Sequence, residues 1–414
     1  MSDRQPPAPG GLRYRLREPL PLLRRGAGAV RTAWREGRMG SLPVALGLVA
    51  IWITFTCIDT AFLSTRNLSN MSVDLVGLGL ITIGVIFVLL VGDIDLSVGS
   101  VSGLAAAIFA QLNVYGGVPE WLAGLVALLA GAAAGAVHGF FVARVGVPAF
   151  VVTLAGLLAW NGLMLLVLDP RGSIELNDQG LIASLTNRYL AHPAFPLTLA
   201  ALGVAAHLVV ALSGRHRRTA AGLPARPLAV VLLRAALWAA LLFTAAGIFI
   251  GARGLPLAFL IFMAVLVGSD FLLRRTTYGR KIFALGGGIE AARRAGIAVV
   301  AVRMSVFVVS GAMAALGGLF LASRIASVGQ TSGSGDLVID VIAAAVIGGV
   351  SLFGGRGTVW AALLGAAVIE SIASGMALLG VTAAVQFMIT GCVLLAAVVL
   401  DSMARQAQQT HGRA

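Results

Sequence analysis

Two aspartates, Asp93 and Asp95, stand between long apolar runs in the segment 91–103, VGDIDLSVGSVSG. A carboxylate at membrane depth is costly, and within a membrane it indicates a functional site by default. Glycines such as Gly99 permit a broken helix here, and Asp95 or Ser97 can cap the helix that follows. The spacing predicts a break that carries polar groups. Two roles stay open for the aspartates: lining a pathway, or capping an interfacial turn without meeting substrate.

A second glycine-rich segment, IGGVSLFGGRGT at 347–358, repeats part of this pattern and carries Ser351. The spacing Gly-x-Ile-x-Leu-x-x-Gly that starts at Gly92 recurs as Gly-x-Val-x-Leu-x-x-Gly from Gly348 to Gly355. Matching interrupted segments in the two halves of a transporter point to a pathway at the repeat interface. The two copies have the same orientation if every apolar run spans the membrane, and inverted orientations if one run is re-entrant.

Isolated polar side chains also stand within apolar runs, and Asn161 and Gln386 are candidates for lining a pathway. A lone polar residue among membrane helices is more often satisfied by a neighbouring helix. Both roles stay open for these two residues.

A short basic segment, GGGIEAARRAGI at 286–297, has the residues of a docking element. Glu290 suits the start of a helix, and Gly296 is a natural helix terminator. The small residues Ala291, Ala292 and Gly296 permit close approach to a partner, while the arginines suit an acidic surface. The segment therefore predicts a helix that inserts into a groove of a cytoplasmic partner. The alternative is an amphipathic loop lying on lipid headgroups.

The composition is that of a membrane protein built of helices. The chain has 414 residues, of which 58% are apolar and only 11% are charged, and its mean hydropathy is +0.95. These values exclude a soluble domain and a disordered chain. Because a span needs about 20 apolar residues, the runs predict an all-α polytopic bundle of about ten to twelve transmembrane helices in a bacterial inner membrane.

The charge of +13 is carried almost wholly by arginine, and Lys281 is the only lysine. The arginines fall in alternate segments between apolar runs, so the positive-inside rule explains them better than nucleic-acid binding does. With an even number of spans, this distribution places both termini in the cytoplasm. We therefore expect membrane lipid, and no nucleic acid, as a partner.

The same pattern predicts the organisation of the chain. A basic cytoplasmic segment, 1–40, precedes a transmembrane domain, 41–402, and a cytoplasmic tail, 403–414, follows it. Within the domain, 274–303 is the longest basic loop, and 195–255 holds two apolar runs joined by a segment with several arginines.

Signatures of enzymes and metal proteins are missing from the sequence. There is no phosphate-binding G-x-x-x-x-G-K-[ST] loop, no HExxH and no Cys/His cluster, and Cys57 and Cys392 stand alone in apolar runs. We expect no catalytic residue, no metal and no cofactor.

Several segments together resemble the permease subunits of ribose, galactose and xylose ABC importers, over roughly residues 44–402. The segments are GDIDLSVGSVSGLAA at 92–106, PAFVVTLAGLLAWNGLML at 148–165, YGRKIFALGGGIEAARRAGI at 278–297, and DVIAAAVIGGVSLFGGRGTVWAALLGAAVIESIASGMALLGV at 340–381. The apolar pair within 195–255 resembles the insertion of the xylose-type members.

The resemblance implies a type II ABC importer fold and a set of partners: a permease homodimer, two ATPase subunits and an external sugar-binding protein. It also implies that Glu290, Ala291, Ala292 and Gly296 form the coupling helix that docks on the ATPase. Two departures stand out. Family members commonly have Gly at Asp93, and asparagines at Ser371 and Ser374.

Two functions of other classes stay open besides an importer of xylose or a related pentose. One is a secondary transporter driven by an ion gradient, although dense intramembrane charge of the kind a proton relay needs is lacking. The other is a membrane scaffold or sensor that binds partners without moving solute.

Overall fold

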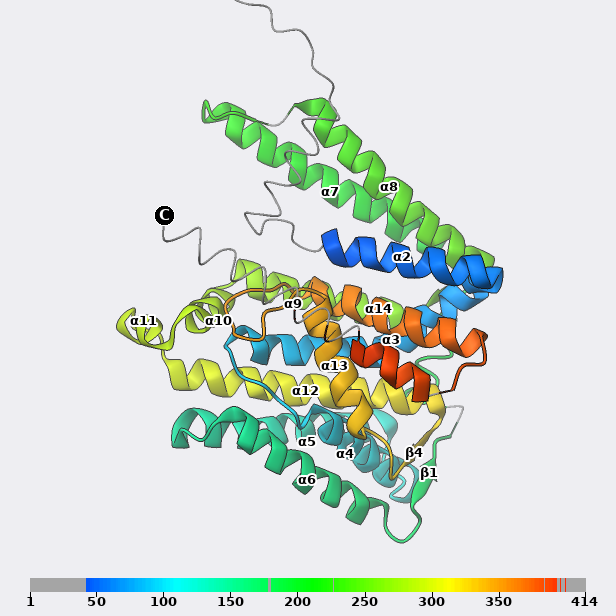
Figure 1. Cartoon of the computed structure of the whole chain (residues 1–414), viewed down its shortest axis with the longest axis vertical. Helices are drawn as coiled ribbons and strands as arrows, with labels where there is room; N and C mark the ends of the chain where they lie inside the picture. The colour runs from blue at the N-terminus through cyan, green and yellow to red at the C-terminus, as the bar shows by residue number, and fades with distance from the viewer. Residues whose placement is uncertain are drawn as a thin grey trace, which may run out of the picture. The chain divides into compact units, whose positions relative to one another are not determined.

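The computed structural model describes residues 42–177, 180–225, 227–382 and 384–392, together with residues 395 and 399. It confirms the predicted all-α membrane bundle (Figure 1). In this described part, nine helices are long and apolar enough to cross a membrane. With their terminal π-turns included, they are α3 (Thr65–Leu90), α4 (Val98–Tyr115), α5 (Glu120–Val145), α6 (Ala149–Leu168), α7 (Ala194–Ala220), α8 (Leu228–Gly251), α9 (Leu257–Arg275), α12 (Val299–Ile325) and α14 (Trp360–Leu378).

Shorter elements complete the bundle. They are α2 (Leu42–Ile58), η1 (Thr60–Leu63), α10 (Thr277–Gly287), α11 (Ile289–Arg294), α13 (Gly335–Ile347) and a helical stretch from residue 384. Strand β1 (Ser173–Glu175) pairs antiparallel with β4 (Ser327–Gly329), and β2 (Tyr189–Leu190) with β3 (Leu255–Pro256). The predicted segments 1–40 and 403–414 lie outside the described residues.

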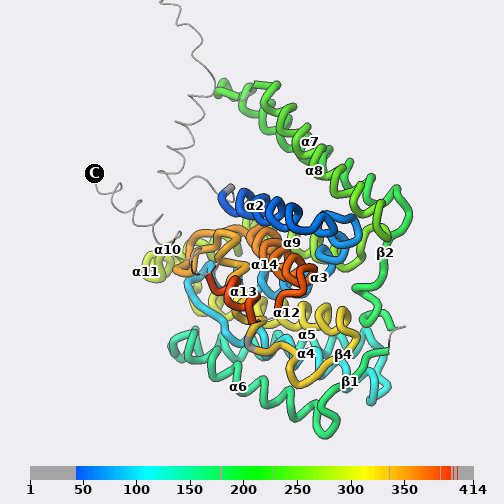
Figure 2. The backbone as a smooth tube through the Cα atoms, turned by 45° about the vertical axis from the view of Figure 1, so that its right-hand side comes forward, coloured from blue at the N-terminus to red at the C-terminus, as the bar shows by residue number. Residues whose placement is uncertain are grey.

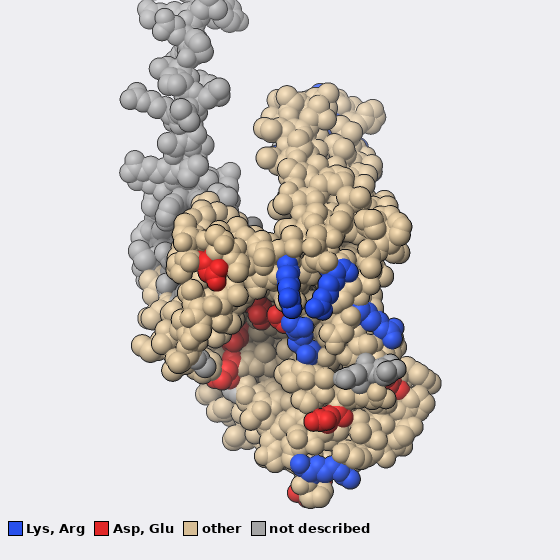
Figure 3. Space-filling model, turned by 90° about the vertical axis from the view of Figure 1, so that its right-hand side faces the viewer, with Lys and Arg blue, Asp and Glu red and all other residues tan. Residues whose placement is uncertain are grey.

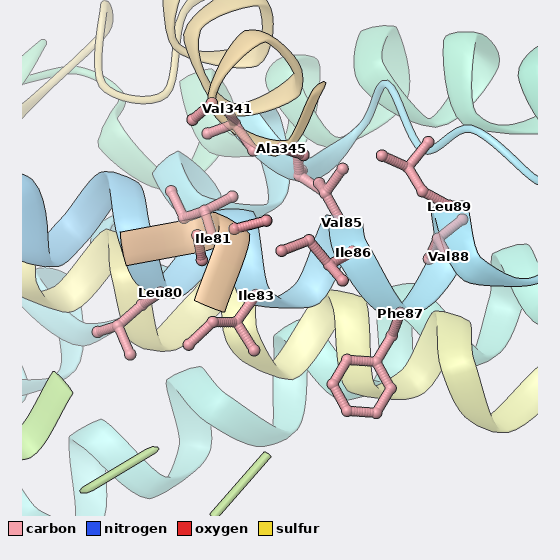
Figure 4. Close-up of a cluster of buried hydrophobic side chains, with 14 of the residues drawn as sticks. Leu80, Ile81, Ile83, Val85, Ile86, Phe87, Val88, Leu89, Val341 and Ala345 are labelled. Carbon is pink, nitrogen blue, oxygen red and sulfur yellow. The ribbon is translucent and has the colours of Figure 1, made fainter. Parts of the chain in front are cut away.

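Helix α3 forms the centre of the bundle. Its sequence is apolar on all sides, and nearly every residue from Met71 to Leu90 is buried, as expected for a helix surrounded by others. It packs on α12, α14, α13 and α9. Figure 4 shows its side chains, with Val341 and Ala345 of α13 packed above them.

Helices α5 and α12 approach each other closely at small residues. A Cβ atom on Gly131 would lie 2.6 Å from the Ala315 Cβ, and one on Gly139 would lie 2.9 Å from the Met304 Cα. Glycines at such points let membrane helices pack backbone to backbone. This close pair fixes α12 against α5, and α12 then positions the polar groups described below.

The apolar run at 338–350 does not span the membrane as one helix. It forms α13, whose 13 residues reach about 20 Å, against about 30 Å for the hydrocarbon core. An irregular segment, 348–358, continues from it to the start of α14. Similarly, the non-helical residues 91–97 precede α4. We name residues 91–97 the first break and residues 348–358 the second break.

The two ends of the bundle differ in structure. Helices α10 and α11 lie at one end, on the left in Figure 1, and the strand pairs lie at the other (Figures 1 and 2). We refer to these as the α10–α11 end and the strand end. Helix α3 ends at Leu90 and α12 begins at Val299 at the α10–α11 end, where both breaks also come together.

Helices α7 and α8 form a hairpin in the region predicted as an extra pair, 195–255. They pack on each other, and α8 also contacts α3. Most of their large apolar side chains are exposed, and Figures 1 and 2 show the hairpin projecting beyond α2. An apolar surface this large on a membrane protein is suited to lipid contact.

Candidate coupling and translocation site

Asp93 in the first break forms an ion pair with Arg303 of α12. The Arg303 Nε donates to the Asp93 Oδ2 at 2.6 Å, and Nη2 donates to Oδ1 at 2.5 Å. This two-point geometry is the strongest form of such a pair, and Asp93 is only 7% exposed. Asp93 is therefore a paired charge that fixes the break to α12. Arg303 lies within α12, although the sequence places it just before an apolar run that starts at 304.

Asp95, two residues after Asp93 in the first break, accepts three hydrogen bonds. The Ser97 amide and hydroxyl donate to Oδ1 at 3.0 and 2.6 Å, and the Ser310 hydroxyl donates to Oδ2 at 2.9 Å. Asp95 and Ser97 are 2% and 1% exposed. The Ser97 side chain makes no capping hydrogen bond to α4, because its hydroxyl is directed to Asp95. The bond from the Ser97 amide to Asp95 is an aspartate turn that leads into α4.

The network continues to His138 and Trp160, on α5 and α6. The Trp160 Nε1 donates to the His138 Nε2 at 2.8 Å, and the His138 Nδ1 lies 3.3 Å from the Ser97 Oγ. Since an indole nitrogen can only donate, the His138 Nε2 must be unprotonated and the ring proton sits on Nδ1. The ring is therefore neutral, and the donors run in one direction from Trp160 through His138 and Ser97 to Asp95.

Two further contacts hold the first break. The Thr153 Oγ1 of α6 donates to the Ile94 carbonyl at 3.3 Å. Gly99, in the first turn of α4, lies so close to the loop before α13 that a Cβ would be 2.6 Å from the Gly333 carbonyl oxygen. Gly99 thus serves close packing as well as the predicted break.

Backbone contacts and the Ser351 hydroxyl help to hold the second break. Gly348 packs against α14, where a Cβ would lie 2.6 Å from the Ala361 Cα. The buried Ser351 donates its amide to the Arg356 carbonyl at 3.0 Å, and its hydroxyl accepts from the Phe353 amide at 3.2 Å. Ser351 therefore shapes a tight loop in which its hydroxyl is directed to the backbone.

The two breaks meet at the α10–α11 end. The Gly355 amide donates to the Leu90 carbonyl at 2.9 Å. A Cβ on Gly354 would lie 2.9 Å from the Gly92 amide nitrogen, and one on Gly286 of α10 would collide with the Leu90 oxygen and the Gly355 nitrogen. We name these five residues the glycine junction. Gly92 of the first break thus lies beside Gly354 of the second, and Gly355 lies beside Gly286, a glycine from the predicted coupling loop.

The predicted coupling residues lie on α11 and just after it. Glu290, Ala291 and Gly296 are exposed, whereas Ala292 is only 3% exposed and packs into the core. Glu290 accepts from Arg293 at 3.1 Å on the exposed face. Gly296 has a φ of 78°, which favours glycine at a helix end. Three of the four predicted residues are therefore available to a partner, and Ala292 anchors the turn.

Helix α10 is tied to α12 by the Tyr278 hydroxyl, which lies 2.8 Å from the Ser305 Oγ. Burial raises the pKa of Tyr278 above its ordinary value, and the hydrogen bond to Ser305 lowers it by less. The neutral phenol is therefore the stable form. This bond braces the two helices that flank α11.

Asn161 and Gln386 lie apart from the hydrogen-bonded network around Asp95. Both are half-buried, on α6 and on the helical stretch from residue 384. Neither makes a side-chain hydrogen bond to any residue that the structure describes. Their role on a pathway stays a prediction.

Ser371 and Ser374 on α14 contact neighbouring helices. The Trp52 Nε1 of α2 donates to the Ser371 Oγ at 2.9 Å, and the Ser374 Oγ donates to the Asn67 Oδ1 of α3 at 3.1 Å. Both hydroxyls thus join α14 to its neighbours.

Further charges lie toward the strand end. The Arg324 Nε of α12 donates to the Asp74 Oδ1 of α3 at 2.6 Å. Both of these charges interact electrostatically with Glu370 of α14. Figure 3, which shows this end, has basic side chains beside a recess in which acidic side chains lie. An ion pair therefore lies near each end of α12, Arg303–Asp93 at one end and Arg324–Asp74 at the other.

Neither Arg303 nor His138 is identified as a partner of the aspartates by sequence spacing. The available signal was electrostatic: a buried Asp93 requires a cation, and Arg303 stands at the edge of an apolar run. No comparable signal links Ser310 or Trp160 to the first break.

The fold and the two breaks define a class, the polytopic permeases of membrane transport systems. The family model for the branched-chain amino acid transport system / permease component matches residues 67–398. The chain is similar to a xylose transport system permease protein of Escherichia coli K12, with 37% identity over 361 residues, covering 87% of this chain and 91% of that protein. A Haemophilus influenzae xylose transport system permease protein is 32% identical, covering 87% and 96% of the two chains. A Bacillus subtilis ribose import permease protein is 30% identical, covering 88% and 94%.

This chain belongs to that family of transport-system permease components, as its motifs predicted. It is a multi-pass inner-membrane protein of a family of transport permease components. No solved structure matches it significantly.

Proposed function

We propose that this chain is the transmembrane permease subunit of an ATP-binding-cassette importer that translocates xylose or a related pentose. The observation that carries the proposal is the exposed surface formed by Glu290 and Ala291 of α11 and by Gly296 in the turn after it. A short helix with small exposed residues, joined to the glycine junction through Gly286 of α10, is suited to receive a push from a partner.

The relatives support the choice of sugar. Those with 37% and 32% identity are named for xylose transport, and the ribose permease protein has 30% identity. The family model carries the name of branched-chain amino acid transport, whereas the relatives named here are xylose and ribose permease proteins and favour a monosaccharide. The α7–α8 hairpin fits the xylose-type insertion expected from the sequence.

The partners follow from the proposed role. A separate ATPase subunit hydrolyses ATP and docks on α11, and a periplasmic or extracellular binding protein delivers sugar at the strand end. The permease works as a homodimer, with α7 and α8 in contact with lipid. The α10–α11 end faces the cytoplasm, and so do both termini, 1–40 and 403–414.

The mechanism uses the contacts of α11. Closure of the ATPase pair on ATP pushes the coupling helices, and the spans switch from inward- to outward-facing. The binding protein then releases sugar into the cavity. Because Asp93 and Asp95 are engaged by Arg303 and by three hydroxyl or amide donors, they organise the break and do not bind the sugar.

The docking role of Gly296 predicts a loss of association. Gly296→Arg places a long side chain on the docking face, where a Cβ meets nothing within 4 Å inside the protein, so the fold should persist. We expect detergent co-purification with the cognate ATPase to fall at least tenfold. Gly296→Ala is the control, because it shares the backbone strain at φ 78° without the bulk.

Equal association of wild type, Gly296→Ala and Gly296→Arg would reject α11 as the docking element. Failure of the wild type to bind any ATPase would favour the alternative, an ion-coupled secondary transporter. In that case a protonophore should abolish uptake at constant ATP.

A further inference from the structure

Both flanks of α11 hold the same part of the membrane domain, the first break. On the amino-terminal side, Gly286 of α10 packs against Leu90, the residue that precedes the break, and against Gly355, next to the Gly354 that packs on Gly92. On the carboxyl-terminal side, α12 reaches the break through Arg303. We propose that the first break receives the motion of α11 through these two contacts, the glycine junction and the Arg303–Asp93 pair, and passes it to α5 and α6. This inference rests on the proposed function.

The glycine junction is a contact between backbones. A Cβ on Gly286 would fall onto the Leu90 oxygen and the Gly355 nitrogen and would lie 3.0 Å from the Gly355 Cα. Backbone atoms in contact have no rotamers that could absorb a displacement, and close-packed interiors transmit strain. A shift of α10 must therefore move the end of α3 or the second break, or both.

The Arg303–Asp93 pair gives the second link. Helix α12 begins at Val299, shortly after α11 ends at Arg294, and Arg303 lies one turn into it. Its two bonds to Asp93, at 2.5 and 2.6 Å, fix both position and orientation. Since Tyr278 also bonds Ser305, α10 and α12 are braced to move together.

Residues 94–97, in the second half of the first break, contact helices α5, α6 and α12. Asp95 and Ser97 connect it to Ser310 of α12 and His138 of α5, and Thr153 of α6 bonds Ile94. Displacement of residues 91–97 therefore moves the start of α4 and, through these bonds, α5 and α6. A break in an otherwise helical span is where such a shift costs least, because it disrupts no helical hydrogen bond.

Two neighbouring glycines give a matched test. A Cβ on Gly286 collides with the junction, whereas a Cβ on Gly287 meets nothing within 4 Å. Gly286→Ala and Gly287→Ala are to be reconstituted with the ATPase and binding protein in proteoliposomes. The readouts are ATPase retention, ATP hydrolysis and uptake of labelled xylose.

We expect Gly286→Ala to retain the ATPase and to hydrolyse ATP, while uptake per ATP hydrolysed falls about tenfold. Gly287→Ala should match the wild type. Normal coupling in Gly286→Ala, equal defects in the two variants, or loss of ATPase retention by Gly286→Ala would overturn the inference. If the wild type itself neither binds the ATPase nor transports, it is the proposed function that fails.

A measurement on the wild type keeps the inference testable if Gly286→Ala does not fold. Hydrogen exchange of the complex should show changed protection at residues 94–97 when ATP binds. Unchanged exchange there, alongside a change at α11, would show that the motion bypasses the first break and would contradict the inference.

Discussion

The two breaks share a sequence pattern but are held by different physical means. The first, residues 91–97, is held by side chains: an ion pair to Arg303 and the hydrogen bonds of Asp95. The second, residues 348–358, is held by backbone contacts at Gly348 and by the turn around Ser351. One glycine pattern therefore permits a break in both places, while separate sets of residues determine its conformation.

This difference has a consequence for transport. Side-chain contacts connect the first break to three helices, α5, α6 and α12. The backbone contacts of the second break reach α14 and the glycine junction. Under the proposed mechanism, the first break therefore distributes the motion of α11 and the second supports it.

The largest effect should come from removing Arg303. Arg303→Ala leaves Asp93 buried without its cation, and breaking such a pair costs about 3–5 kcal/mol. Thermal unfolding in detergent should show strong destabilisation or loss of folded protein. The double variant Arg303→Ala/Asp93→Ala should recover much of that stability, and a double variant no better than the single one would contradict the pair's role.

A smaller loss is expected in the second break. Gly348→Ala forces a methyl group against the backbone of α14, and overpacking of this kind costs about 1–3 kcal/mol. Gly162→Ala in α6 is the control, because its Cβ meets nothing within 4 Å. If both variants unfold at the same temperature, the close contact between Gly348 and Ala361 is not a constraint.

The smallest loss of stability should come from Trp160, the first donor in the hydrogen-bonded series from Trp160 through His138 and Ser97 to Asp95. Trp160→Phe removes the donor to the His138 Nε2, and loss of one such hydrogen bond costs about 1 kcal/mol. The variant should fold with slightly lower stability, and its His138 should no longer be held in one tautomer. Nitrogen NMR of labelled histidine measures this, and an unchanged tautomer would show that Ser97 fixes the ring alone.

Much of the architecture was predictable because it depends on local pattern. Apolar runs located the spans, and the glycine spacing located both breaks and indicated that they were related. Length gave a further signal at 338–350, where a run of only 13 residues forms α13 and a discontinuous span. The sequence left open whether every apolar run spans the membrane, and the structure shows that turns and irregular chain at 348–358 follow α13.

The partners within the site were not predictable because they depend on packing between distant helices. Asp93 and Arg303 are separated by 210 positions, and their pairing needs α3, α5 and α12 to be in place. The burial of Ala292, in contrast to exposed Ala291, likewise depends on how α11 rests on its neighbours. Sequence spacing identified residues able to dock or pair, and the fold selected among them.

The central claim is that ATP hydrolysis by a separate subunit drives sugar through this chain. Its most direct test is uptake of labelled xylose into proteoliposomes that contain the permease and its ATPase, with the binding protein outside and ATP inside. The account predicts uptake that requires both ATP and the binding protein and that persists with a protonophore. Uptake that needs no ATP and stops with the protonophore would contradict it.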